Sequence, residues 1–139
     1  MKFITDFHIH SHYSIATSKN LIPEHLEYWA KIKGINVIGT GDCIHPGWSK
    51  ELEEKFEYHE NGLYKLKDEF ILPESKYLYN KKKSGDVYFM LTGELSSIYK
   101  KEGKVRKVHN LCVFPDFESL KKVQDRLDNL GNIRSDGRP

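Results

Sequence analysis

Residues 35–42 read Ile-Asn-Val-Ile-Gly-Thr-Gly-Asp, a short apolar run that ends in glycines and an aspartate. A run of this length and composition is typical of a buried strand. Residues 23–32 predict a helix that has proline in its first turn and is ended by Gly34. Residues 3–9 alternate apolar and polar side chains and predict an earlier strand. The order strand, helix, strand implies parallel pairing with a right-handed crossover, so the expected fold class is α/β.

The segment of about residues 48–86 is predicted to be an insert between buried strands. Residues 48–58 are charged and helix-forming, and a turn signal at residues 61–62 precedes the short run 63–66. We therefore expect an inserted helix and a short hairpin. Residues 81–86 are interpreted as a solvated loop, and the alternative is that its three lysines contact phosphate.

The last third of the chain predicts a strand, a hairpin and a helix. Residues 87–92 predict a buried strand, and Gly93 and Glu94 follow at its end. Residues 96–100 and 105–114 flank a glycine turn and predict a hairpin. Residues 117–130 carry apolar side chains at helical spacing. The expected architecture is therefore a mostly parallel sheet with a hairpin.

Composition narrows the class of protein. The chain has 139 residues, of which 38% are hydrophobic and 30% charged, and this excludes a collagenous or wholly disordered chain. The net charge of +2 is too small to argue by itself for nucleic-acid binding. The longest apolar runs are far shorter than the roughly 20 residues that span a bilayer. With no secretory signal at the N-terminus, we expect a cytoplasmic protein without a membrane partner.

Candidate metal ligands stand at the predicted ends of three strands. Residues 6–10 read Asp-Phe-His-Ile-His, and in an extended chain the side chains of His8 and His10 project to the same side. Asp42 and Glu94 end the next two buried strands. The carboxyl ends of parallel strands form the functional face of α/β folds, and these residue types bind zinc, manganese or iron. The plain alternative is that two histidines merely border a strand.

The same motifs, taken in order, resemble those of the PHP (polymerase and histidinol phosphatase) superfamily. They are DFHIHS at 6–11, GTGDCIHP at 39–46 and TGE at 92–94. Together with VHNLCVFP at 108–115 and SDGRP at 135–139, they look like the endonuclease Q type of PHP protein, which nicks DNA beside deaminated bases. The resemblance implies a metal-dependent phosphoesterase with a distorted seven-stranded (β/α) barrel. A complete eight-fold barrel needs about 250 residues, so this chain holds only a part of such a fold.

The resemblance also implies a set of metal ligands for two or three divalent ions: His8, His10, Asp42, His45, Glu94 and His109. Within this set, Asp42, Glu94 and His109 are expected to serve catalysis, with Glu94 bridging two ions and a metal-activated water as the nucleophile. The second motif usually has adjacent Asp and His, whereas two residues separate Asp42 from His45 here, so both stay open as ligands. Asp6 is expected to orient a histidine ligand through its second ring nitrogen.

Basic side chains gather on the predicted hairpin at Lys100, Lys101, Lys104, Arg106 and Lys107. Solvated charge is the plain interpretation. The resemblance favours contact with a DNA backbone.

The family completes its metal site with a later histidine and an Asp-x-His pair, and nothing after Glu94 has that spacing. We therefore expect residues 1–139 to be the N-terminal part of a PHP domain, truncated before the last ligand motifs. An exposed sheet edge in such a chain can pair with a second copy. The expected function is a DNA endonuclease or phosphodiesterase acting at deaminated bases. A non-catalytic metal- or DNA-binding fragment and a histidinol-phosphatase-like small-molecule phosphatase are the alternatives.

Overall fold

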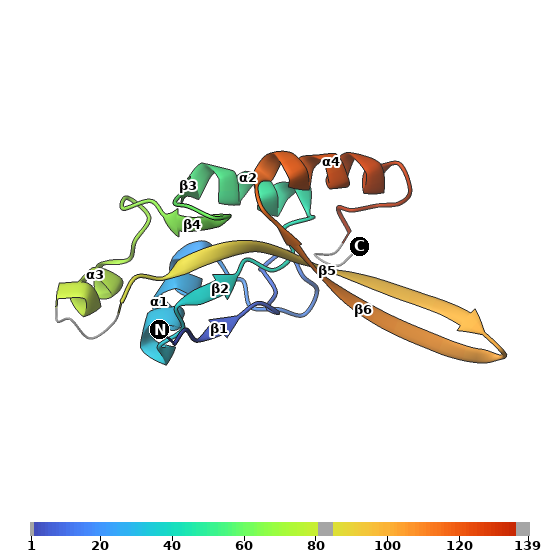
Figure 1. The fold of residues 1–139 in the computed structure, drawn as a ribbon, viewed down its shortest axis with the longest axis horizontal. Helices are drawn as coiled ribbons and strands as arrows, with labels where there is room; N and C mark the ends of the chain where they lie inside the picture. Colours follow the sequence, from blue (N-terminus) through green and yellow to red (C-terminus); the bar gives the residue numbers. More distant parts are fainter. Residues whose placement is uncertain (1, 81–84, 136–139) are drawn as a thin grey trace.

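The computed structural model describes residues 2–80 and 85–135, which form an α/β fold (Figure 1). The described residues form the strands β1 (Thr5–Asp6), β2 (Val37–Gly39), β3 (Phe56–Tyr58), β4 (Leu63–Leu66), β5 (Tyr88–Lys101) and β6 (Lys104–Phe114). Their helices are α1 (Pro23–Lys33), α2 (Pro46–Lys55), α3 (Pro73–Asn80) and α4 (Phe117–Asp128). The expected α/β class is confirmed. None of these helices is long and apolar enough to cross a membrane.

The sheet is parallel in its core and antiparallel toward its other strands. Its order is β1-β2-β5-β4-β3, and β6 pairs with β5 outside this path. β1 pairs with β2 and β2 pairs with β5 in parallel, while β4 joins β5 in the antiparallel direction. The predicted strand, helix, strand unit is therefore β1, α1 and β2. The insert contains the expected helix, α2, and the expected hairpin of β3 and β4.

The structure differs from the sequence patterns most clearly at two strands and one helix. β1 covers only Thr5–Asp6, because its partner β2 is itself only three residues long. β5 does not end at Glu94: it leaves β2 after Met90 and continues, paired with β6, to Lys101. The sequence patterns did not predict α3, a helix of eight residues within the insert.

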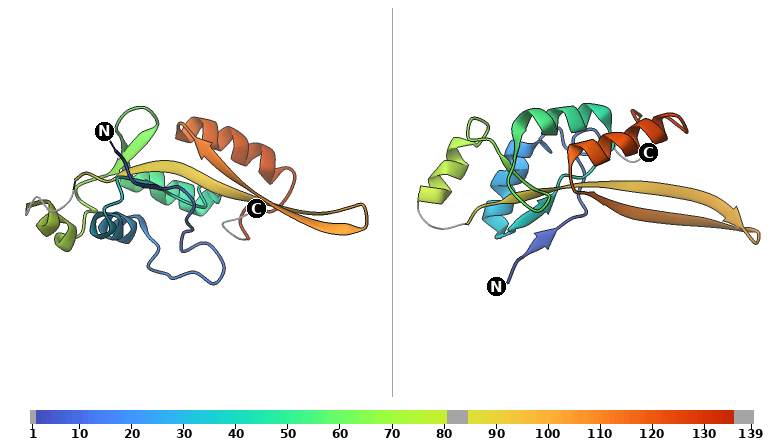
Figure 2. Two further views of the ribbon diagram at one scale, coloured as in Figure 1. Left: turned by 60° about the horizontal axis from the view of Figure 1, so that its bottom comes forward. Right: turned by 45° about the horizontal axis from the view of Figure 1, so that its top comes forward.

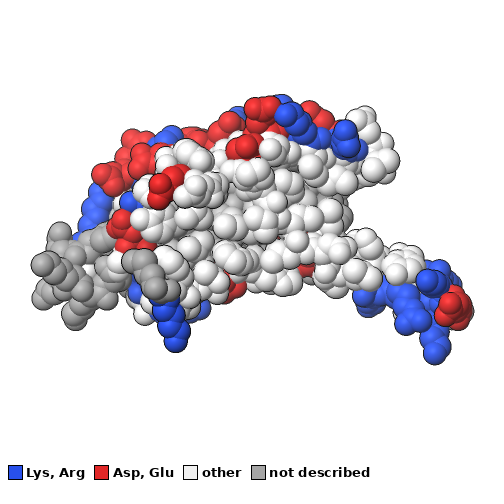
Figure 3. Space-filling model, in the orientation of Figure 1, with Lys and Arg blue, Asp and Glu red and all other residues white. Residues whose placement is uncertain are grey.

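The second half of β5 and most of β6 project from the body as a two-stranded ribbon (Figures 1 and 2). The predicted hairpin is thus confirmed, and its tip turns at Glu102 and Gly103, whose φ angles of 54° and 73° are left-handed. Lysine and arginine side chains gather at this free end (Figure 3). The ribbon is longer than the predicted hairpin because it includes the part of β5 that carries Glu94.

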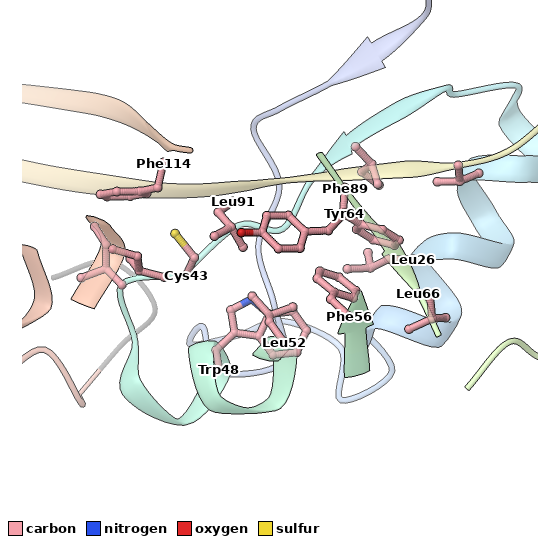
Figure 4. Packing of buried hydrophobic residues seen from close by; sticks show 14 of the residues in the cluster. Leu26, Cys43, Trp48, Leu52, Phe56, Tyr64, Leu66, Phe89, Leu91 and Phe114 are labelled. Atoms are coloured by element: carbon pink, nitrogen blue, oxygen red, sulfur yellow. The ribbon is translucent and has the colours of Figure 1, made fainter. Parts of the chain in front are cut away.

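The core lies on one face of the sheet. Ile38, Phe89 and Tyr64 stand in register on three neighbouring strands and are almost completely buried. Helices α1, α2 and α4 bring apolar side chains into the same cluster, among them Leu26 and Trp48 (Figure 4). Removing this apolar surface from water stabilises the fold by roughly 25 cal/mol per Å².

The opposite face of the same strands is open. Its side chains remain half-buried and, together with the exposed ring of Phe3, line a groove of about 620 Å³. In the described parts of the chain, no helix contributes to this groove. We call this surface the open face; its apolar side chains are Phe3, Phe7, Val37, Leu63, Tyr88 and Met90. Tyr88, Met90 and Glu94 differ by even numbers of residues, so Glu94 projects from β5 on this same face.

Candidate metal centre

His8, His10 and Glu94 meet beyond the carboxyl end of β1. One ligand atom from each side chain lies within 4.8 Å of the other two. His8 Nε2 is 2.8 Å and His10 Nε2 is 3.6 Å from Glu94 Oε2. The His8 side chain is 53% exposed, whereas that of Glu94 is 4% exposed. The cluster therefore combines a buried carboxylate, that of Glu94, with a solvent-accessible imidazole, that of His8.

Two glycines allow the chain that carries the histidines to lie against the end of β2. A Cβ atom at Gly39 would stand 2.6 Å from the carbonyl oxygen of Phe7. At Gly41, where φ is +60°, a Cβ atom would stand 2.3 Å from the carbonyl oxygen of Ile9. Any side chain at these positions would push away the segment of His8 and His10. The Gly-Thr-Gly motif thus serves close backbone packing.

The carboxylate of Glu94 contacts different partners with its two oxygens. Oε2 faces His8 and His10, whereas Oε1 accepts a hydrogen bond from the Ser96 hydroxyl at 3.0 Å and contacts His109 Nδ1. Burial raises the pKa of Glu94, but the hydrogen bonds with His8, His109 and Ser96 outweigh it and lower the pKa to about 2. Glu94 is therefore ionised at neutral pH, with one oxygen toward each group of histidines.

His109 reaches Glu94 through the register of the hairpin. It pairs directly with Ser96, two residues after Glu94, so all three side chains share one face of the ribbon. The Ser96 hydroxyl lies 3.2 Å from His109 Nδ1. Sequence reasoning missed Ser96, although its two-residue spacing from Glu94 is a signal that was present.

Asp42 contacts His10 from the side away from Glu94. Its carboxylate is fully buried, and Oδ1 lies 3.0 Å from His10 Nδ1. Oδ2 accepts hydrogen bonds from the Ser11 backbone N–H, the Ser11 hydroxyl and the Ser14 hydroxyl at 2.6, 2.8 and 2.9 Å. Asp42 thus lies behind a clustered histidine and is not one of the three grouped ligands.

His45 serves as the N-cap of α2. Its Nδ1 accepts hydrogen bonds from the backbone N–H groups of Gly47 and Trp48, and Nε2 lies 3.2 Å from the Arg134 carbonyl oxygen. Burial lowers the pKa of His45, and the hydrogen bond to Arg134 opposes this only in part. Both ring nitrogens are therefore occupied away from the cluster.

Asp6 and His12, which flank His8 and His10 in the sequence, do not belong to the cluster. Asp6 is exposed on β1, and in the described segments it makes no hydrogen bond to a histidine. The contact expected of Asp6 is made to His10 by Asp42 instead. His12, which continues the spacing of His8 and His10, places Nε2 2.9 Å from Glu51 Oε2 on α2.

The register divides the basic residues of the hairpin between its two faces. Lys100 and Lys107 share the face of Glu94 and His109, whereas Lys101, Lys104 and Arg106 lie on the opposite face. All five are exposed. Residues 81–84 of the loop predicted at 81–86, which include its three lysines, and residues 136–139 at the end of the last motif lie outside the described residues.

Comparison with known proteins supports one relationship. No family model matches the chain. It is 47% identical over 49 residues to an uncharacterized protein of Methanocaldococcus jannaschii, covering 35% of this chain and 6% of that protein. It is 31% identical, with a TM-score of 0.70, to the lesion-specific endonuclease PfuEndoQ from Pyrococcus furiosus. The chain is 32% identical, with a TM-score of 0.71, to endonuclease Q in a structure with a 27-mer duplex substrate that has an abasic lesion at the active site.

The fold is similar to that of endonuclease Q. Both structural matches cover 97% of this chain and 28% of the solved chain, so the chain spans less than a third of these proteins. The endonuclease Q-like fold expected from the motifs is confirmed, while membership of the PHP superfamily stays a prediction. So do the ligand roles of Asp42, His45 and the other candidate residues.

Proposed function

We propose that this chain forms the metal-binding part of a PHP-type phosphodiesterase that cleaves DNA beside damaged bases. The observation that carries this proposal is the convergence of His8, His10 and Glu94 within 4.8 Å. The fold in which they converge is similar to that of a lesion-specific endonuclease. Deaminated bases, which the motifs suggest, are the proposed lesions.

The donor atoms suit divalent transition metals. Imidazole nitrogens and carboxylate oxygens are ligands for zinc, manganese and iron. His8, His10 and Oε2 of Glu94 would hold one ion, and His109 with Oε1 of Glu94 would take part in holding a second. The ionised state of Glu94 supports this arrangement, because its negative charge favours cations on both sides.

Bound divalent ions supply an acidified water and offset the charge of phosphoryl oxygens. The chain contributes an open approach, since the side chains of His8 and His109 are 53% and 49% exposed. Glu94 contributes a fixed negative charge below them. The fully buried Cys43 is an unsuitable nucleophile, because burial raises the pKa of its thiol well above the ordinary value. A water nucleophile therefore suits this site.

The hairpin supports a polymeric substrate. It projects beyond Glu94, and lysine and arginine side chains gather at its free end (Figure 3). By register, Lys100 and Lys107 share the face of Glu94, where lysines can contact the phosphates of a bound polymer and add affinity without sequence preference. One endonuclease Q structure contains duplex DNA, and this agrees with DNA as the proposed substrate.

Metal content is the first test of the proposal. Protein purified without chelator is expected to contain one or two divalent ions per chain by elemental analysis. The double variant His8→Ala/His10→Ala should lose them. The matched control His25→Ala/His59→Ala removes two histidines outside the cluster and should keep them. Equal metal content in the wild type and the His8/His10 variant would contradict this site.

Substrate preference is the second test. Metal-loaded protein is assayed on duplexes containing uracil, hypoxanthine or an abasic site, and on small phosphate monoesters. Nicking of damaged duplexes supports the proposal. Preference for small monoesters would favour the phosphatase alternative, and metal binding without turnover of either kind of substrate would favour a non-catalytic domain.

A further inference from the structure

We infer that Asp42 is a positioning residue that fixes the tautomer of His10 and so leaves His10 Nε2 free to bind metal. The motif resemblance places Asp42 among the metal ligands, whereas the contacts give it a role behind one of them. This inference rests on the proposed metal-binding function, but its structural part can be tested without metal.

The first step concerns the hydrogen bonds of Asp42. Three donors, two from Ser11 and one from Ser14, converge on Oδ2 at 2.6 to 2.9 Å. The remaining oxygen, Oδ1, faces His10 Nδ1 at 3.0 Å. A carboxylate oxygen accepts hydrogen bonds, and Oδ1 lies closer to Nδ1 than the Ser14 hydroxyl does at 3.4 Å, so we place the hydrogen between Oδ1 and Nδ1 on His10.

The second step concerns the other ring nitrogen. A neutral imidazole that carries hydrogen on Nδ1 has its free electron pair on Nε2. His10 Nε2 is the atom that faces Glu94, at 3.6 Å from Oε2. The contact with Asp42 therefore directs the ligating electron pair toward the cluster. Carboxylates that hold metal-binding histidines in this way raise ligand basicity and fix ring orientation.

The third step concerns how firmly Asp42 is held. The turn of Gly41 and Asp42 is left-handed, with φ angles of 60° and 47°. The Gly41 backbone N–H donates to the Thr92 hydroxyl at 3.0 Å, and its carbonyl accepts from Trp48 Nε1 at 2.8 Å. Thr92 and Trp48 are fully buried. The carboxylate is thus placed by the core and has little freedom to move toward the metal cluster.

The variant Asp42→Asn tests the tautomer directly. The amide oxygen must take the place of Oδ2, because three donors point at that position. The NH2 group then faces His10 Nδ1 and favours hydrogen on Nε2, the tautomer that cannot bind metal. In metal-free protein, ¹⁵N NMR of the His10 ring should show hydrogen on Nδ1 in the wild type and on Nε2 in the variant. Metal affinity should fall about 10- to 100-fold.

A buried neighbour provides the control for general disruption. Cys43→Ala creates a cavity beside Asp42 and should lower thermal stability, while the His10 tautomer and the metal affinity stay as in the wild type. An equal loss of affinity in Cys43→Ala would overturn the positioning role.

A double-mutant cycle separates positioning from direct ligation. If Asp42 acts only through His10, Asp42→Asn causes no further loss of metal affinity in a His10→Ala background. A further loss there would make Asp42 a ligand and overturn the inference. A wild-type His10 ring with hydrogen on Nε2 and none on Nδ1 would overturn it even if the variant does not fold. A wild-type protein that binds no metal contradicts the proposed function instead, and the NMR result still decides the role of Asp42.

Discussion

Glu94 is buried and yet negatively charged, and its hydrogen-bond partners decide its ionisation state. Its side chain is 4% exposed, which by itself favours the neutral acid. Hydrogen bonds with His8, His109 and Ser96 favour the carboxylate more strongly and lower its pKa to about 2. A buried carboxylate surrounded by imidazoles favours the binding of cations. It also makes the stability of the fold depend on pH.

The stability of the metal-free protein should depend on Glu94 at acidic pH. Its folded pKa of about 2 lies below the ordinary 4.5, so the stabilisation is complete above about pH 4.5 and is lost as pH falls toward 2. The expected contribution is on the order of 3 kcal/mol. Glu94→Gln should therefore flatten the free energy of unfolding between these pH values, measured by urea denaturation with chelator present.

The control for this measurement is Glu118→Gln on α4. The side chain of Glu118 is 80% exposed and pairs only with Lys122, four residues along the helix. Its loss should leave the acid slope unchanged. A wild-type slope in Glu94→Gln would contradict the assigned hydrogen bonds.

The sequence allowed the ligands of the cluster to be predicted better than the residues behind them. His8 and His10 follow the two-residue period of an extended chain, and Glu94 follows a buried apolar run. Ser11 and Ser14, which hold Asp42, come from a loop without any period, so no pattern indicates them. Asp6 was a reasonable candidate by proximity in sequence; it is exposed on β1, and among the described residues no hydrogen bond joins it to a histidine, so its orienting role stays a prediction.

Helix α2 begins at an imidazole, and this gives the element its own pH dependence. Burial lowers the pKa of His45 below 6.5, and its Nδ1 accepts from Gly47 only when it is unprotonated. The stabilisation is therefore present above about pH 6.5 and is lost as pH falls through the folded pKa. His45→Asn keeps a capping acceptor that does not titrate, so its melting temperature should change less between pH 7.5 and 5.5.

His25→Asn on α1 is the matched control for the capping prediction. It removes a histidine that makes no cap, and it should keep the wild-type pH dependence. Because helix caps contribute about 0.5–2 kcal/mol, the difference is within reach of thermal denaturation. Identical curves for His45→Asn and the wild type would show that His45 does not link this helix to pH.

The hairpin should bind DNA with one face. Lys107 shares the face of Glu94 and His109, whereas its neighbour Arg106 projects to the opposite face. For a duplex lying over the cluster, Lys107→Gln should weaken binding to every sequence and reduce the slope of log affinity against log salt by about one. Arg106→Gln removes an equal charge and should have a smaller effect. Fluorescence anisotropy at several salt concentrations measures both.

Each outcome of the hairpin experiment has a distinct meaning. Equal effects of both variants would show that charge alone matters and that the faces are not distinguished. Unchanged affinity and salt slope in both variants would remove the hairpin from the DNA contact. Metal content should stay at the wild-type value throughout, since neither side chain belongs to the cluster.

Elements with a clear period were predicted, and elements without one were not. Helix α1 and the glycine turn of the hairpin agree with their patterns. The projecting part of β5 is exposed on both faces, so no alternation indicates that it continues the strand of Glu94. Helix α3 is short, and its buried Ser75 hydroxyl donates to Glu27 of α1. Such a tertiary contact cannot be read from local sequence.

At the scale of the whole molecule, the helices of the described segments pack on one face of the sheet. The open face carries an apolar groove lined by Tyr88 and Met90 of β5, and Glu94 projects from β5 on the same face. Pairing of a second copy at the exposed sheet edge also stays a prediction.

Nicking by this chain alone should be slow. The three residues of the cluster and His109 make four candidate ligands, and the chain spans 28% of the endonucleases it resembles. Fewer ligands leave a bound water less acidified, and the exposed side chains of His8 and His109 leave the site open to solvent. We expect the chain alone to nick a uracil-containing duplex at least about 10- to 100-fold more slowly than a chimera in which it replaces the matching part of PfuEndoQ. The chimera carrying His8→Ala/His10→Ala is the inactive control. Equal nicking by the chain and the chimera would contradict this prediction, because it would mean that residues 1–139 already form a complete site.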